Sequence, residues 1–254
     1  MRKMVEYNAP IRDYEFLLNE VLDAIPIVQK LGYSEFDEEF LSMLTDGWAE
    51  HVKEVWLPVN QLGDREGLTY SDGEIMMPDE FKNAYKESVD AGWLSTSCKP
   101  EHGGMGVPIF FQTVIWAEFG TSANMALSVL PALSVGVYEV LAEHGEKELV
   151  DYFATNMASG KWSGTMCLTE PHAGTDLGMI STKAVPQKDG TYLVTGTKIF
   201  ITYGEHDMTE NIVHLVLAKT PDAPEGTRGI SLFLVPKYMP SEWKSEGLSG
   251  VSEE

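Results

Sequence analysis

The segment from Met166 to Asp176 places a hydroxyl, a proline and a small-residue turn within one short stretch. Thr169 ends an apolar, strand-like run, so its hydroxyl and the nearby backbone N–H groups lie at a strand end. Gly174 has no side chain and lets a bulky ligand approach the backbone closely. Thr175 beside it carries a hydroxyl that can donate to an anionic oxygen. The segment therefore predicts a turn that can bind a ligand.

A second segment, Lys198 to Gly204, follows a short distance later. We expect a strand over Lys198–Thr202, which would place Phe200 and Thr202 on one face because side chains alternate along a strand. An aromatic ring can stack on a flat ligand, and a hydroxyl can bond to its edge. A flavin is a ligand of this shape.

Each feature has a more ordinary explanation when it is taken alone. The Thr169–Pro171 tripeptide is typical of a strand end, and an isolated phenylalanine such as Phe200 is typical of a core. Asp176 is more typical of a cap or turn than of a catalyst. Only the combination of the two segments favours a ligand site.

The acidic and sulfur-bearing residues do not predict a metal centre. Glu205–Asp207 contains three ligand types, but adjacent residues rarely all reach one ion, and no second ligand group has suitable spacing. Cys98 and Cys167 are far apart and match no metal spacing. Two reduced thiols are typical of a cytoplasmic protein, and we predict that location.

The composition limits the classes of partner. The 254 residues include 18 basic and 39 acidic side chains, giving a formal net charge of -21. This charge disfavours nucleic acid and anionic membrane surfaces as partners. We see no secretory signal and no run approaching the ~18 apolar residues of a membrane helix.

The first part of the chain is predicted to be helical, because apolar residues recur there at spacings of three and four. Pro26 is expected to end the first helix, and Asn60–Gly73 is expected to be a loop. The helices are predicted over residues 11–25, from 34–37 to 58, and over 78–92, 109–120, 124–144 and 146–158.

After Lys161 the pattern changes to short β-branched runs. Asp189-Gly190 predicts a hairpin turn, because this pair accepts positive φ angles. Strands are predicted over residues 162–169, 182–185, 191–194, 198–202, 212–219 and 229–235. Helices followed by strands indicate an α+β fold, a helical bundle and then a small antiparallel sheet or barrel. We predict an α-helical domain over 1–160, an incomplete β-domain over 161–240 and a polar tail over 241–254.

The two segments together resemble the acyl-CoA dehydrogenase family. They occur in the expected order, at positions 166 and 200, after a helical part that contains Lys99–Gly106, which is similar to the family's Pro-Glu-x-x-Gly-Gly segment. Within the family, Leu18–Leu22 and Gly204–Leu217 most resemble the large type that includes 3-methylmercaptopropionyl-CoA dehydrogenase.

This resemblance implies a set of residues that bind FAD. Backbone groups of Met166 and Leu168 and the hydroxyl of Thr169 would contact the flavin ring near its reactive edge. Donors at that edge stabilise the reduced ring.

The same resemblance assigns roles to three further side chains. Phe200, where many relatives have tryptophan, would pack on the ring, and Thr202 would bond its edge. Thr175, often serine in relatives, would lie near the pyrophosphate or the acyl-CoA.

The implied reaction is α,β-desaturation of an acyl-CoA thioester with hydride transfer to flavin N5, and electrons then pass to an electron-transfer flavoprotein. The family's base is a glutamate in a C-terminal helical domain, which we expect to lie outside these residues. No residue here matches that base, and Glu170, the nearest acid, belongs to a turn. The full-length enzyme is expected to be a homo-oligomer.

The expected position of the base bears on the activity of the isolated chain. As a fragment, it is expected to retain little flavin and to have no desaturase activity. Two alternatives are a non-enzymatic module that binds acyl-CoA or a partner protein, and one subunit of a split dehydrogenase.

Overall fold

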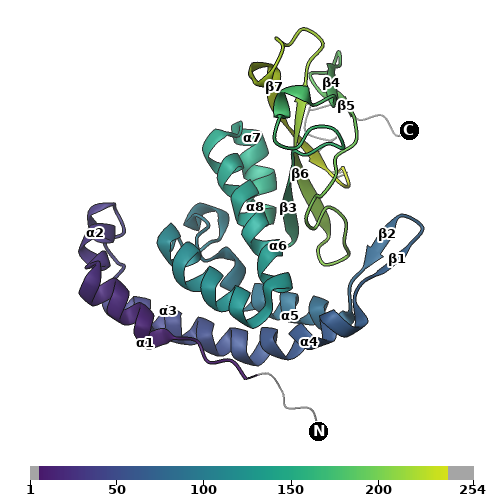
Figure 1. The fold of residues 1–254 in the computed structure, drawn as a ribbon. Coiled ribbons are helices and arrows are strands. Elements are labelled where there is room, and N and C mark those ends of the chain that lie inside the picture. The colour runs from purple at the N-terminus through teal and green to yellow at the C-terminus, as the bar shows by residue number, and fades with distance from the viewer. Residues whose placement is uncertain (1–5, 240–254) are drawn as a thin grey trace.

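The computed structural model describes residues 6–239, in which a helical part is followed by a mixed β-sheet (Figure 1). The predicted order of helices before strands is therefore confirmed, whereas the predicted tail over 241–254 lies outside the described residues. The helices are α1 Ile11–Glu15, α2 Ala24–Lys30, α3 Glu38–His51, α4 Leu57–Glu66, α5 Asp79–Asp90, α6 Ala117–His144, α7 Lys147–Leu149 and α8 Thr155–Ala158.

Short stretches of other helix types extend or connect these helices, and two of them lie between strands of the sheet. The π-helical stretches are Phe16–Val21, Val52–Trp56, Phe111–Trp116 and Val150–Ala154, and the 3₁₀ turns are Trp93–Ser95, Pro100–His102, Leu177–Met179 and Thr227–Gly229. The strands are β1 Thr69–Ser71, β2 Glu74–Met76, β3 Trp162–Cys167, β4 Lys183–Pro186, β5 Tyr192–Thr195, β6 Asn211–Lys219 and β7 Ile230–Pro236.

Two predicted boundaries in the first helices are wrong. The chain turns at Asp23, which has a φ of 48°, and Pro26 lies inside α2 near its start, where a missing N–H is tolerated. The predicted loop Asn60–Gly73 is largely helix and hairpin, because α4 continues to Glu66 and β1 begins at Thr69. No residue of α4 is fully buried, so its polar sequence resembles a loop.

Aromatic packing holds the helical part together. The Trp48 and Trp116 rings stack with their centroids 4.9 Å apart, and the Trp56 ring meets both of them edge-on. The buried indole N–H of Trp48 donates to the carbonyl of Trp116 over 2.9 Å, so this ring leaves no unpaired polar group.

The central helical stretch 111–144 consists of two helices that meet at Asn124. Its backbone angles there are not helical (φ -157°, ψ 97°), and its side chain accepts from the N–H of Leu127 and donates to the carbonyl of Trp56. By length and composition alone the stretch could cross a membrane, with a mean hydropathy of 1.7. Half of that apolar window is buried in the protein, which is expected of a core helix.

The sheet is mixed, whereas the sequence predicts antiparallel pairing. The order is β3-β6-β4-β5, with β7 paired to β6 on the side away from β3. β6 runs parallel to β3 and antiparallel to β7, and only Lys219 of β6 pairs with Lys183 of β4. Parallel pairing requires a long crossover, and here the β4–β5 hairpin and the second segment occupy it.

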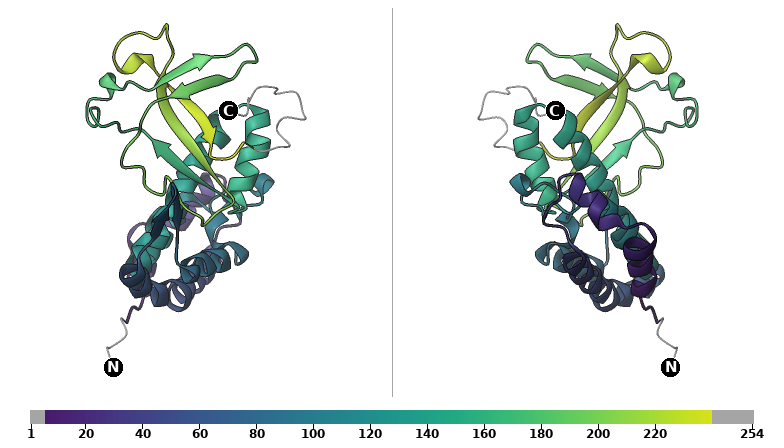
Figure 2. Two further views of the ribbon diagram at one scale, coloured as in Figure 1. Left: turned by 90° about the vertical axis from the view of Figure 1, so that its right-hand side faces the viewer. Right: turned by 90° about the vertical axis from the view of Figure 1, so that its left-hand side faces the viewer.

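The β4–β5 hairpin itself is as predicted. The two strands are antiparallel, and Gly190 in their turn has a φ of 87°. α6 packs against β3, and the sheet lies at one end of the helical part (Figures 1 and 2).

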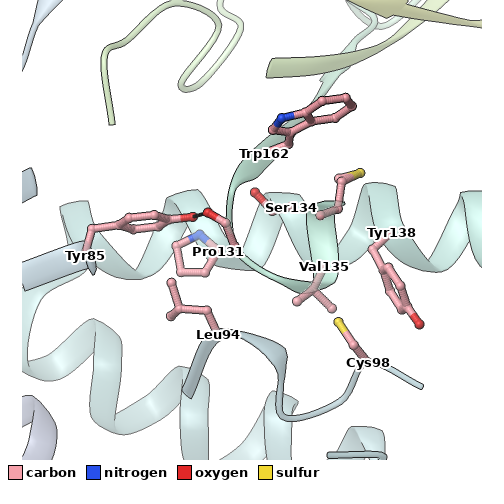
Figure 3. Close-up of a pocket in the computed structure, with 10 residues that line it drawn as sticks. Tyr85, Leu94, Cys98, Pro131, Ser134, Val135, Tyr138 and Trp162 are labelled. Carbon is pink, nitrogen blue, oxygen red and sulfur yellow. Dashed lines mark hydrogen bonds between the residues drawn. The ribbon is translucent and has the colours of Figure 1, made fainter. Parts of the chain in front are cut away.

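Close contacts join the helical part to β3 and the residues just before it, and the hydrogen bond of Tyr85 is drawn in Figure 3. The N–H of Gly164 in β3 donates to Ser134 Oγ of α6 over 3.0 Å, and a side chain at Gly164 would lie 2.6 Å from Val137. Tyr85 Oη donates to the carbonyl of Gly160 over 3.1 Å. β3 therefore has a fixed position relative to the helices, as a binding site at its end requires.

Candidate functional site

The first segment begins on an open edge of β3. Within the described residues β3 pairs only with β6, and the Gly164 N–H points away from β6 toward Ser134. Because backbone direction alternates along a strand, the N–H of Met166 points to the same open edge. Leu168, two residues further on and just beyond the end of β3, continues this alternation of N–H directions. The N–H groups on this edge are therefore available to a ligand, whereas the Leu168 carbonyl already accepts from Lys198.

Two hydrogen bonds to backbone carbonyls of the first segment join it to the second segment. The N–H of Ile199 donates to the carbonyl of Thr169 over 2.9 Å, and Lys198 Nζ donates to the carbonyl of Leu168 over 3.0 Å. The structure thus places the second segment beside the end of β3, as a shared site requires.

The predicted strand Lys198–Thr202 is wrong, and the segment is an irregular loop. Phe200 and Tyr203 both have positive φ angles, 56° and 52°, which interrupt extended backbone. The argument that Phe200 and Thr202 share a strand face therefore fails. Both side chains nevertheless lie at the surface, and the Phe200 ring is 89% exposed.

Thr175 lies in a separate exposed turn. Asp176 forms this turn by accepting from the N–H of Gly178 over 3.1 Å, which agrees with the turn role that its sequence context indicates. No hydrogen bond joins Thr175 to Phe200 or Thr202 in residues 6–239. The structure brings Thr169 and the second segment together, and no hydrogen bond within residues 6–239 links Thr175 to that segment.

Glu170 is the buried anchor of the first segment. Its carboxylate is 2% exposed and accepts from the backbone N–H and the hydroxyl of both Ser181 and Thr182 at 2.5–3.0 Å. Lys198 Nζ adds a fifth donor at 2.9 Å. Burial alone would raise the pKa of Glu170, but these donors hold it well below its usual range.

This arrangement argues against Glu170 as a general base. All five donors would lose their acceptor if the carboxylate turned toward a substrate, and its depressed pKa makes it a weak base. The carboxylate holds the two segments together instead.

An open cleft lies behind the loop and is lined in part by Cys167, Lys198, Ile201 and His214. His214 Nδ1 lies 2.7 Å from Thr165 Oγ1 and 3.8 Å from Cys167 Sγ. Burial raises the pKa of the Cys167 thiol and lowers that of His214, so both remain neutral near pH 7. A thiolate nucleophile is therefore not formed here.

The sequence reasoning missed three residues that hold the loop. In the sequence the Glu205–Asp207 run carries part of the family resemblance and contains metal-ligand types, but it does not indicate loop anchoring. Its members bond to different partners: Glu205 to Lys237, His206 to Ser163, and Asp207 to Lys82. The position of this run directly after the second segment was the available signal. Tyr203 also bonds outside the loop, to the carbonyl of Ala126.

The described residues fit a flat ligand with polar edges. An open strand edge at Met166, the exposed Phe200 ring and the Thr202 hydroxyl lie on neighbouring segments. No hydrogen bond within residues 6–239 uses the side-chain hydroxyl of Thr169, Thr175 or Thr202. An exposed aromatic ring and free hydroxyls are the groups that a flavin needs for stacking and edge bonding.

Comparison with known proteins gives matches over most of the chain. Residues 65–161 match the family model "Acyl-CoA dehydrogenase, N-terminal domain", and residues 165–252 match "Acyl-CoA dehydrogenase, middle domain". The chain is 44% identical to 3-methylmercaptopropionyl-CoA dehydrogenase of Ruegeria pomeroyi over 93% of its own length and 40% of that protein. It therefore spans well under half of this relative.

Two solved structures share the fold. One, of the electron transferring flavoprotein of Acidaminococcus fermentans, has a TM-score of 0.66 and 26% identity over 81% of this chain and 49% of the other. The second, acyl-CoA dehydrogenase complexed with FAD from Bacillus anthracis, has a TM-score of 0.63 and 23% identity over 81% of this chain and 32% of the other.

Proposed function

The chain belongs to the acyl-CoA dehydrogenase family, and we propose that it forms the N-terminal and middle part of an enzyme that desaturates an acyl-CoA thioester. The observation that carries this proposal is the junction of Thr169 with Ile199. This bond brings an exposed aromatic ring and a free hydroxyl beside an open strand edge.

In this proposal the chain binds FAD along that edge. The backbones of Met166 and Leu168 and the hydroxyl of Thr169 bond to the ring edge, while Phe200 packs on its face and Thr202 bonds to its rim. When bound, the flavin accepts the hydride of the family reaction.

Thr175 has a separate role in this proposal. Its exposed hydroxyl bonds to the pyrophosphate or to the acyl-CoA, both of which are anionic.

In this proposal the catalytic base and the electron acceptor come from outside these residues. Glu170 is fully engaged with five donors, so we propose that a glutamate beyond the 254 residues removes the α-proton. A separate electron-transferring flavoprotein would accept the electrons. The whole enzyme would be a cytoplasmic homo-oligomer, and methylmercaptopropionyl-CoA is the first substrate to test, because a relative at 44% identity is named for it.

Titration with FAD tests the cofactor assignment. The purified chain is expected to carry little flavin, but added FAD should bind, with weaker binding in Phe200→Ala and Thr202→Val. Glu210→Ala is the control, because its exposed side chain lies outside the proposed site. Equal FAD affinity in all four proteins would refute the assigned site.

Reaction with acyl-CoA tests the position of the base. FAD-loaded chain should not be bleached by methylmercaptopropionyl-CoA in the absence of further polypeptide. Bleaching by the chain alone would contradict a base outside it. Acyl-CoA binding without any FAD binding would instead support a non-enzymatic module.

A further inference from the structure

We propose that Tyr203, His206 and Asp207 form a three-point clamp that positions Phe200 and Thr202. The three residues contact three different elements of the fold. The inference rests on the proposed function only for the identity of the ligand that the loop binds. The clamp itself is a property of the protein alone.

The first contact reaches the long core helix. Tyr203 Oη donates to the carbonyl of Ala126 in α6 over 2.6 Å. The Tyr203 ring also packs edge-on against His206, with centroids 5.5 Å apart. The loop is therefore tied to the helical part directly after Thr202.

The second contact reaches β3, the strand that carries the first segment. His206 is 2% exposed, and its Nδ1 accepts from the N–H of Met208 over 3.1 Å. The proton of the neutral ring must then be on Nε2, which donates to Ser163 Oγ over 3.1 Å. Burial lowers the pKa of His206 to about 4, so the ring is neutral at pH 7.

The third contact reaches the segment between the β1–β2 hairpin and α5. Asp207 Oδ1 accepts from the N–H of Met77 over 2.8 Å, and Oδ2 accepts from Lys82 Nζ over 2.9 Å. Lys82 also pairs with Asp79 at 3.0 Å. The hydrogen bond from the Met77 backbone has a fixed geometry. The side chains of the Lys82–Asp207 ion pair are about a third exposed, so this pair contributes little to stability.

Backbone strain explains why a clamp is needed. Phe200 and Tyr203 both adopt the left-handed conformation, which costs about 1–2 kcal/mol for a residue with a side chain. An unsupported surface loop would relax to a less costly conformation and reorient Phe200 and Thr202. The contacts of Tyr203, His206 and Asp207 lie immediately after these residues and oppose that relaxation.

Hydrogen exchange on the 254-residue chain tests the clamp without any ligand. The reporter is the N–H of Gly204, which donates to the carbonyl of Ile201 over 3.0 Å inside the loop. Asp207→Ala removes both acceptors and should speed this exchange about tenfold or more, the factor expected for a hydrogen bond to a charged group. Exchange of Val213 in the buried strand β6 reports global unfolding and should accelerate by no larger a factor than exchange of Gly204.

Two further variants distinguish positioning from a general loss of stability. Asp207→Asn keeps an acceptor for Met77 and should change Gly204 exchange less than about threefold. Glu210→Ala removes an exposed carboxylate three residues away and should have no effect. Unchanged Gly204 exchange in Asp207→Ala, or equal acceleration of Gly204 exchange in Glu210→Ala, would overturn the clamp.

Affinity for FAD alone links the clamp to the site. Asp207→Ala should weaken FAD binding about tenfold while Asp207→Asn retains it, in parallel with the exchange at Gly204. Faster Gly204 exchange with unchanged FAD affinity would overturn the positioning role. If the wild type binds no FAD, the proposed function fails, while the exchange rates still decide whether the clamp exists.

Discussion

Glu170→Gln should destabilise the protein strongly although the two side chains have nearly the same shape. The glutamate accepts from five donors, three at Oε1 and two at Oε2. A glutamine must turn its NH₂ group toward one of these sets, where donor would face donor. It also leaves Lys198, whose side chain is 9% exposed, without its counter-ion.

The size of this effect follows from the buried ion pair. Removing one partner of such a pair costs about 3–5 kcal/mol, because the other charge remains buried and unpaired. A domain is stable by about 5–15 kcal/mol in total, so the urea midpoint should fall markedly. Tryptophan fluorescence follows the transition, because the cluster of Trp48, Trp56 and Trp116 is buried.

The pH dependence provides an independent check of the same prediction. The folded pKa of Glu170 is depressed, so its stabilisation is fully present above its ordinary value of 4.5 and is lost as the pH falls below that value. The difference in unfolding free energy between wild type and Glu170→Gln should therefore be greatest near pH 7 and should narrow below about pH 4.5. Groups common to both proteins cancel in this difference.

A matched control separates burial from simple loss of charge. Glu210→Gln removes the same charge from an exposed position and should change stability by less than about 0.5 kcal/mol. The reasoning is refuted if Glu170→Gln costs less than about 1 kcal/mol at pH 7, or if its cost does not decrease in acid.

Four further substitutions test other parts of the structure. Gly164→Ala should lower the free energy of unfolding by about 1–3 kcal/mol, because its new methyl group would lie 2.6 Å from Val137. Gly136→Ala, in the open face of α6, should raise it by roughly 1 kcal/mol, and urea unfolding measures both. His206 has a pKa lowered from 6.5 to about 4, so it makes the wild type lose stability as the pH falls from 6.5 toward 4, and unfolding of His206→Gln should lack that part of the decline. Phe200→Ala should change stability by less than about 0.5 kcal/mol, because the ring is 89% exposed, yet weaken FAD binding by about threefold to tenfold.

Local sequence signals predicted the elements that depend on local chemistry. Asp37 lies within the predicted start of its helix, and its side chain caps that helix by accepting from the N–H of Phe40 over 2.8 Å. Asp189-Gly190 predicted the β4–β5 turn, because few residue pairs accept its backbone angles. These features depend on residues within a few positions of one another.

The errors arose where distant contacts override local preference. Lys198–Thr202 has the β-branched pattern of a strand, but its Ile199 N–H bonds to Thr169 and its backbone turns at Phe200. The parallel pairing of β3 with β6 is likewise set by a crossover of more than forty residues between Cys167 and Asn211, which no local period encodes. The proposed site residues could be named from motif resemblance, but their orientation could not.

The loop that carries Phe200 and Thr202 is held at both of its ends by chemically different anchors. At its start Lys198 is fixed by Glu170 and by the carbonyl of Leu168, and beyond its end Asp207 is fixed by the backbone of Met77. The first anchor joins the loop to the strand end that it must face, and the second joins it to the helical part. An exposed ring with a strained backbone can therefore persist before any ligand binds, because both anchors oppose its relaxation. The cost of ordering the loop is then met during folding, so a ligand that stacks on Phe200 need not supply that free energy.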